Sequence, residues 1–317
     1  MKAETGIAQP PATLAPTPAG SSPAPKPAAT SAAKAKSRTK SRAKAKAEAI
    51  AAAVQVSADD AAALPAPAPA GTPVLPAPWI LDPAVLANNR IVGFGSMNED
   101  VHPFFMLRAA LLNHAVATHQ RVFAVTSAQA GNGKTHVATN LAATLSRIHP
   151  TVLIELDLRQ PQLGTRLGLA ADTPGVDDYL SGEAEWADTA VPIEGFDLTV
   201  HRVRRARVNA EPLLASPALA QILRQFRANG NGPICIVDTP PALVSDDLVL
   251  IARGIDGVLL VVEEARSRKG DIVEAINALN PTPIVGTILN NSITRPRSQN
   301  TYGYHYYRDD AASAPGA

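Results

Sequence analysis

The chain has 317 residues, a formal net charge of +1 and a single cysteine, Cys235. One cysteine excludes an internal disulfide and fits a reducing compartment. No uninterrupted apolar run approaches the roughly 20 residues that a membrane-spanning helix needs, and the first residues lack the apolar core of a signal peptide. We therefore expect a cytoplasmic protein.

Residues 1–85 differ in composition from the rest of the chain. Ala, Pro, Lys, Ser and Thr dominate, and Trp79 is the only tryptophan of this part. Because so few large apolar groups cannot offset the entropy of ordering, we predict a disordered arm. Its residues 34–46 alternate Lys or Arg with small residues, and this spacing does not gather charge on one helix face. The arm could contact anionic lipid, bind nucleic acid weakly and nonspecifically, or serve only as a solubilising tether.

Residues 86–292 are predicted to form one α/β domain. Apolar runs of strand length alternate with amphipathic runs of helix length, which favours a mostly parallel sheet flanked by helices. Most of the strand candidates are continuously apolar, as is typical of strands covered on both faces. The predicted strands are residues 121–126, 151–156, 198–200, 233–237, 257–262 and 283–289, and the predicted helices are residues 135–148, 217–229, 245–253 and 268–279.

A candidate phosphate-binding loop separates the first of these strands from its helix. Gly131 and Gly133 allow a tight turn whose backbone N–H groups can point into one concavity, in front of a helix N-terminus. Lys134 could reach the β- and γ-phosphates, and the Thr135 hydroxyl could ligate Mg²⁺. The common pattern has a glycine where this chain has Ala128. Strand, loop and helix nevertheless occur in the required order, so we predict nucleotide binding.

Three carboxylates follow strand candidates. Glu155 and Asp157 lie at the end of the second strand, and Asp238 ends the fourth. In open parallel sheets, ligands bind at the carboxyl ends of the strands. Each carboxylate alone could be a helix cap or part of an ion pair. Beside a phosphate loop, the three together predict a magnesium site.

The C-terminal region carries four of the chain's five tyrosines: Tyr302, Tyr304, Tyr306 and Tyr307. Residues 293–317 are otherwise polar, and we predict a flexible tail. The tyrosines could form an aromatic docking strip or edge strand. They could also be phosphate acceptors, since each modified tyrosine gains nearly two negative charges.

From about Arg90 to Tyr307 the chain resembles the bacterial tyrosine autokinases (BY-kinases), in particular the soluble CpsD/CapB-like type that works with polysaccharide export. The resemblance rests on motifs that occur in the same order as in the family. They are residues 125–127 with 131–135, then 157–161, 174–176, 211–217, 237–241 and 286–290, followed by the tyrosine cluster.

The resemblance implies a P-loop fold related to the MinD and ParA ATPases, with ATP and Mg²⁺ as cofactors. It implies a non-specific protein-tyrosine kinase that phosphorylates its own tyrosine cluster and regulates capsule or exopolysaccharide synthesis. Thr135, Asp157 and Asp238 would hold Mg²⁺, and Glu155 would take the proton of the acceptor tyrosine. The residues that would hold the nucleotide are Ala130, Gly131, Asn132, Gly133, Lys134, Thr135, His136 and Asn290, and the catalytic set would be Lys134, Glu155, Asp157 and Asp238.

Partners also follow from the resemblance. A membrane-bound polysaccharide copolymerase would supply the activating segment in trans and recruit the chain to the inner face of the plasma membrane. A homo-oligomer is expected as well. The family's oligomerisation helix has one Glu and two Arg at three-residue spacing, whereas the matching positions here are His102, Phe105 and Arg108. A ring built through that contact is therefore not supported.

Other functions stay open at this point. A partition-type ATPase switch usually has a further lysine near the start of the loop, where this chain has Gln129. A degenerate kinase that senses nucleotide as a scaffold is a third possibility, because the family usually has aspartate at the position of Glu155. The added methylene displaces the charge by about a bond length, and such a displacement can be kinetically costly.

Overall fold

The computed structural model describes residues 76–292. The basic segment 34–46 and the tyrosine cluster lie outside the described residues. The domain begins before the boundary expected at residue 85, because Trp79 pairs with Ile193 and the Asp82 carboxylate caps a short helix, α2. Trp79 and Leu81 also pack on the core. No periodic pattern marks this segment, so the sequence did not reveal its place in the domain.

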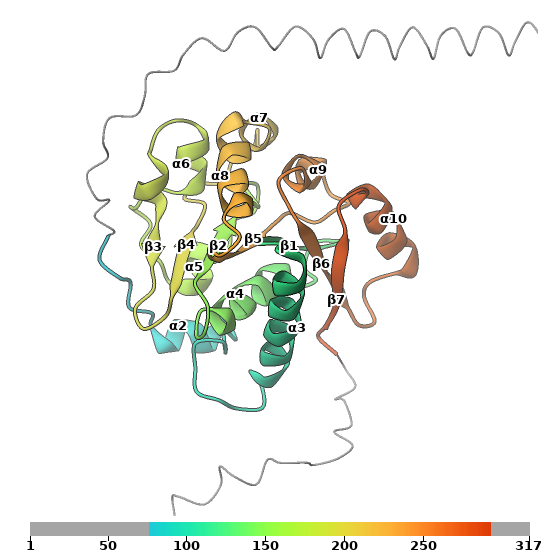
Figure 1. The fold of residues 1–317 in the computed structure, drawn as a ribbon, viewed down its shortest axis with the longest axis horizontal. Coiled ribbons are helices and arrows are strands. Elements are labelled where there is room, and N and C mark those ends of the chain that lie inside the picture. The colour runs from blue at the N-terminus through green and yellow to red at the C-terminus, as the bar shows by residue number, and fades with distance from the viewer. Residues whose placement is uncertain (1–75, 293–317) are drawn as a thin grey trace, which may run out of the picture. The chain divides into compact units, whose positions relative to one another are not determined.

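The domain is built on a seven-stranded sheet with the order β3-β4-β2-β5-β1-β6-β7 (Figure 1). All neighbouring strands are parallel except β3 and β4, which pair antiparallel at one edge. The central strands are buried throughout, as their continuous apolar sequences predicted. The bounds are β1 Val122–Ser127, β2 Thr151–Glu155, β3 Val191–Pro192, β4 Leu198–His201, β5 Ile234–Asp238, β6 Gly257–Glu263 and β7 Ile284–Asn290.

Helices cover both faces of the sheet, which confirms the predicted fold class (Figure 1). Successive residues of β1 show the two layers, since Val122 joins the core under α8, α9 and α10, and Phe123 joins the core under α3 and α4. The helices are α2 Pro83–Asn88, α3 His102–Thr118, α4 Lys134–Leu145, α5 Leu163–Leu167, α6 Val176–Leu180, α7 Glu211–Leu214, α8 Pro217–Ala228, α9 Asp247–Ala252 and α10 Lys269–Leu279, with a 3₁₀ turn at Trp186–Thr189. No helix within the described residues is long and apolar enough to cross a membrane.

Candidate nucleotide-binding site

The predicted phosphate loop connects β1, near the middle of the sheet, to the start of α4. Gly131 and Gly133 have φ of 84° and 88°, the left-handed region that a side chain disfavours. A Cβ on Gly133 would also stand 2.1 Å from Nδ2 of Asn290, which donates to the Asn132 carbonyl at 2.9 Å. Asn290, at the end of β7, therefore contacts the phosphate loop that follows β1.

Lys134 and Asp157 form a buried ion pair behind this loop. The Nζ of Lys134 lies 2.6 Å from Oδ2 of Asp157, and both side chains are buried. Burial lowers the pKa of Lys134, but the carboxylates of Asp238, Asp157 and Glu155 together outweigh burial, so its pKa is raised. Lys134 is thus a fixed positive charge at the first turn of α4, where an anionic phosphate would meet it.

Asp238 carries the least compensated charge of the site. The residue is fully buried, and among residues 76–292 neither carboxylate oxygen has a well-oriented hydrogen-bond donor. Burial raises its pKa to about 6, although Lys134 and then the Thr135 hydroxyl lower it. A buried carboxylate needs a partner. Together with the Thr135 hydroxyl and Asp157, it makes a set of hard oxygen ligands that fits Mg²⁺.

Glu155 is placed differently from what the resemblance implied. The side chain is fully buried, and both oxygens accept hydrogen bonds from the backbone. Oε1 accepts from the N–H groups of Gln162 and Leu163 at 2.6 and 2.8 Å, and Oε2 accepts from Val203 at 2.9 Å. Burial and then the nearby Asp238 raise the pKa of Glu155 to about 7, against the effect of these amides. The carboxylate joins two loops, an arrangement that conflicts with the role of a base free to reach an acceptor.

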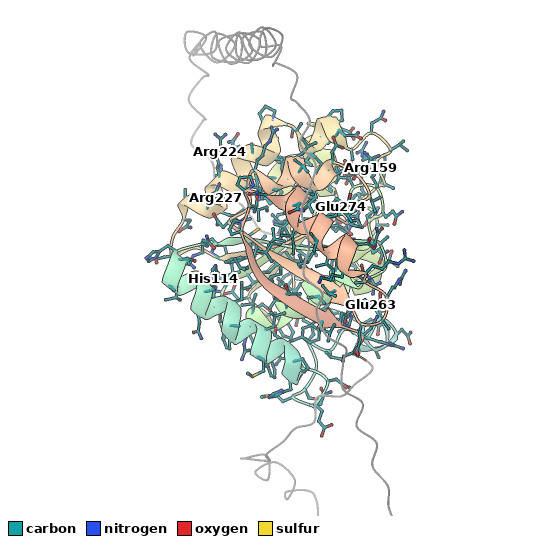
Figure 2. All side chains as sticks on the ribbon, turned by 90° about the vertical axis from the view of Figure 1, so that its right-hand side faces the viewer. His114, Arg159, Arg224, Arg227, Glu263 and Glu274 are labelled. Carbon is teal, nitrogen blue, oxygen red and sulfur yellow. The ribbon has the colours of Figure 1, made fainter. Side chains whose placement is uncertain are left out.

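Arg159, which follows Asp157 in the second motif, ties the end of β2 to two helices. Its Nε donates to Asp247 at 2.7 Å, and an Nη group pairs with Glu211. The helix α9 begins at Asp247 with Asp246 as N-cap, two residues after the start predicted at residue 245. Figure 2 places Arg159 and Glu263 on the same side of the domain, the side on which the parallel strands end.

A pocket of about 690 Å³ opens beside the phosphate loop. Its lining includes Gly131, Gly133, His136 and Asn290, four of the residues expected to hold the nucleotide. Sequence reasoning missed its other walls, because they come from segments that carry no motif. These include Arg90, Asp100, Phe104 and Arg166.

His136 shows the character of that pocket. Its ring meets the ring of Phe104 edge-on, with centroids 5.8 Å apart. Burial, followed by the positive charges of Arg166 and Arg90, lowers its pKa. An aromatic wall in a pocket that Arg90 and Arg166 also line suits the base and ribose of a nucleotide whose phosphates lie in the loop.

Arg108 on α3 is the one position of the family's oligomerisation pattern that this chain matches. Its side chain makes contacts within the domain. Its Nη1 donates to the Thr144 carbonyl at 3.1 Å, and its guanidinium lies 4.6 Å from the centre of the Phe105 ring. Burial and the charge of Arg147 lower its pKa.

Comparison with known proteins points to one group. No protein-family model matches the chain. The chain is 29% identical over 208 residues to the tyrosine-protein kinase Wzc of Salmonella typhi, in a match that covers 63% of this chain and 28% of Wzc. The tyrosine-protein kinase CpsD of Streptococcus agalactiae is 26% identical over 60% of this chain and 83% of its own length.

Solved structures agree with the sequence matches. The kinase domain of the Escherichia coli tyrosine kinase ETK superposes with a TM-score of 0.57 at 26% identity, covering 65% of this chain and 80% of that domain. The chain thus spans little more than a quarter of Wzc but most of an isolated kinase domain. The described domain has a P-loop NTPase fold and is related, in sequence and in fold, to the bacterial tyrosine kinases that include CpsD.

Proposed function

We propose that the chain is an ATP-dependent protein-tyrosine kinase whose acceptors are its own tyrosines Tyr302, Tyr304, Tyr306 and Tyr307. The observation that carries the proposal is the buried Asp238, without a well-oriented donor, beside the Lys134–Asp157 pair and the phosphate loop. Such a cluster fits bound metal and phosphate, whose charges would compensate it. The kinship with tyrosine kinases and the four-tyrosine tail favour tyrosine as the acceptor.

In the proposed reaction, Lys134 and the loop N–H groups hold the β- and γ-phosphates. Thr135, Asp157 and Asp238 would hold Mg²⁺, which neutralises charge on the phosphates. As negative charge spreads over the transferring phosphoryl group, the fixed ammonium of Lys134 stabilises it without having to be reoriented from water. The bond between the γ-phosphorus and the bridging oxygen breaks, ADP leaves with that oxygen, and the tyrosine oxygen takes up the phosphoryl group while its proton passes to solvent water.

The nucleoside half of ATP would occupy the pocket beside the loop. Asn290 lies at its mouth, and His136 and Phe104 offer aromatic surface for the base. Arg90 and Arg166 supply positive charge where the α-phosphate would leave the loop. The pocket is large enough for a nucleoside, since ligand pockets commonly span about 300–1,000 Å³.

The proposed setting is the cytoplasmic face of the plasma membrane. A membrane-bound copolymerase would activate the chain in trans, and the phosphorylated tail would regulate capsule or exopolysaccharide synthesis. A homo-oligomer would bring the tail of one copy to the site of another. The basic segment 34–46 could add contact with anionic lipid, at about 1 kcal/mol per basic residue near the surface, or with nucleic acid.

Intact-mass analysis after incubation with Mg-ATP tests this proposal, with and without the cytoplasmic segment of a candidate activator. We expect added phosphates that map to Tyr302–Tyr307 and are lost in Lys134→Met. Lys269→Met is the matched control, because Lys269 is an exposed lysine at the start of α10. ATP hydrolysis without phosphotyrosine, even with the activator present, would contradict kinase activity.

A second candidate is a nucleotide-operated switch or scaffold that transfers no phosphate. The hydrogen bonds that hold Glu155 to three backbone N–H groups favour it, because they occupy the residue that the resemblance made the base. A switch would change its oligomeric state on Mg-ATP binding and leave the tyrosines unmodified. Light scattering of the same samples used for mass analysis separates the two functions.

A further inference from the structure

The loop between β6 and α10 lies against the outer side of the phosphate loop, although the two are far apart in the sequence. Arg266 carries the contact. Its guanidinium nitrogens approach the carbonyl oxygens of Gly131 and Ala130, at 3.4 and 3.5 Å. A Cβ added to Gly131 would stand 2.9 Å from Nη2 of Arg266, so the glycine is what lets the guanidinium come this close.

Glu263, the last residue of β6, holds Arg266 and the phosphate loop together. Its Oε2 accepts from Nδ2 of Asn132 at 3.0 Å and from Nη1 of Arg266 at 3.3 Å, and its Oε1 accepts from Asn291 at 3.0 Å. Bonds from Asn291 and then Asn132, with the Arg266 charge, lower the pKa of Glu263. An ionised carboxylate at this place would repel phosphate by itself, and Arg266 offsets that charge.

The backbone of this loop directs Arg266 toward Gly131. Ala265 has φ of 61°, in the left-handed region that a non-glycine residue disfavours. The turn is held by two bonds between Glu263 and Ser267, one from the Glu263 N–H to the Ser267 hydroxyl and one from the Ser267 N–H to the Glu263 carbonyl, both 3.0 Å. Glu263 therefore anchors the turn as well as the contact.

We propose that Arg266, with Glu263, is a positioning residue for the phosphate loop. By drawing the carbonyls of Ala130 and Gly131 outward, it leaves the N–H groups of the loop facing the bound phosphates. A nest of this kind binds an anion best when its N–H groups are already oriented. The inference rests on the proposed nucleotide site and adds a residue that none of the sequence motifs contains.

Equilibrium titration with Mg-ATP tests the proposal. Arg266→Ala should weaken binding about 2- to 10-fold, the range expected for loss of one or two modest hydrogen bonds. Arg268→Ala is the matched control, because it removes the same charge from an exposed position two residues away and should bind like the wild type. Arg266→Lys separates charge from geometry, since lysine lacks the planar fork that spans two carbonyls. Positioning predicts that Arg266→Lys binds as weakly as Arg266→Ala.

Amide hydrogen exchange of residues 130–133 without nucleotide gives a second measurement. Exchange there should be faster in Arg266→Ala than in Arg268→Ala, because the outward anchor of the loop is gone. Equal binding and equal exchange in the two variants would overturn the inference, as would wild-type binding in Arg266→Lys. A wild type that binds no Mg-ATP would instead refute the proposed function, and the exchange comparison would still decide this inference.

Discussion

The ionised carboxylate of Asp238 destabilises the domain at neutral pH when no cation compensates its charge. Its pKa is raised from 3.8 to about 6, so the fold disfavours its charged form. The stabilisation that this carboxyl contributes is complete below pH 3.8 and is lost as the pH rises through 6. At pH 8 without ligand, the ionised group therefore lowers the free energy of unfolding by about 3 kcal/mol.

Asp238→Asn should accordingly stabilise the nucleotide-free protein. At pH 8 we expect a melting temperature a few degrees above that of the wild type, with the difference shrinking toward pH 4. The same variant should lose the stabilisation that Mg-ATP gives the wild type. Asp256→Asn is the contrasting control, because Asp256 accepts bonds from two backbone N–H groups and from Arg227 and should melt lower when neutralised. A lower melting temperature for Asp238→Asn at pH 8 would contradict this account.

Glu155 allows two roles to be separated by a pair of variants. If Glu155 orders the loops at Gln162 and Val203, Glu155→Gln should keep much of the phosphotransfer rate, because the amide oxygen can still accept from one loop. Glu155→Ala leaves the buried N–H groups of Leu163 and Val203 without an acceptor, at about 1–3 kcal/mol each, and should lose both stability and activity. We expect this graded result, measured as initial rates of phosphotyrosine formation alongside melting curves. A base would make the two variants equally inactive.

At the scale of elements, residue patterns predicted six of the seven strands in the described domain and the helices α4, α8, α9 and α10, whereas α3, the longest helix there, was expected only from the family resemblance. All six predicted strands exist, because buried parallel strands read as continuous apolar runs. The strand β3 was missed, since it has two residues and contains Pro192. The helices α5, α6 and α7 have four or five residues each, too few to show a helical period. Their positions depend on contacts such as those of Glu155 and Arg159, which the sequence does not display.

The phosphate loop is an element whose backbone conformation can be tested directly. Gly133→Ala puts a Cβ in a left-handed residue and against the Asn290 amide, so the loop must move. We expect Mg-ATP binding to be lost while the fold persists, measured by titration and circular dichroism.

Gly182→Ala is the control, since Gly182 also has a positive φ, of 78°, but no neighbour within 4 Å of an added Cβ. It should cost about 1 kcal/mol of stability and leave binding unchanged. If Gly133→Ala binds Mg-ATP as tightly as Gly182→Ala, the loop is not part of the nucleotide site.

For the whole molecule, the sequence predicted which groups share the carboxyl edge of the sheet but not what surrounds them. Lys134, Asp157 and Asp238 meet because parallel strand order brings the ends of β2 and β5 together behind the loop. Arg266, Arg90 and Phe104 reach the same place from segments whose residues follow no motif. Their contribution depends on three-dimensional packing, which local pattern cannot specify.

The proposed acceptor tyrosines follow β7 in the sequence, and β7 ends at this same edge. The strand β7 ends at Asn290, beside the phosphate loop, and Tyr302 follows Ser292 by ten positions. A fully extended chain of that length spans at most about 35 Å. The maximum reach of the tail therefore allows Tyr302 to approach its own site or that of a second copy.

We expect transfer between copies, because a tether this short limits the orientations in which the first tyrosine can enter its own site in line with the phosphate. Lys134→Met chains, which carry tyrosines but cannot transfer phosphate, should be phosphorylated when mixed with active chains in which Tyr302, Tyr304, Tyr306 and Tyr307 are phenylalanine. The initial rate per active chain should rise with the concentration of the acceptor chain.

Lys134→Met chains with the four tyrosines also replaced are the control and should stay unmodified. If the wild type gains phosphate at a rate per chain that does not change on dilution, while the mixed chains stay unmodified, transfer takes place within one copy.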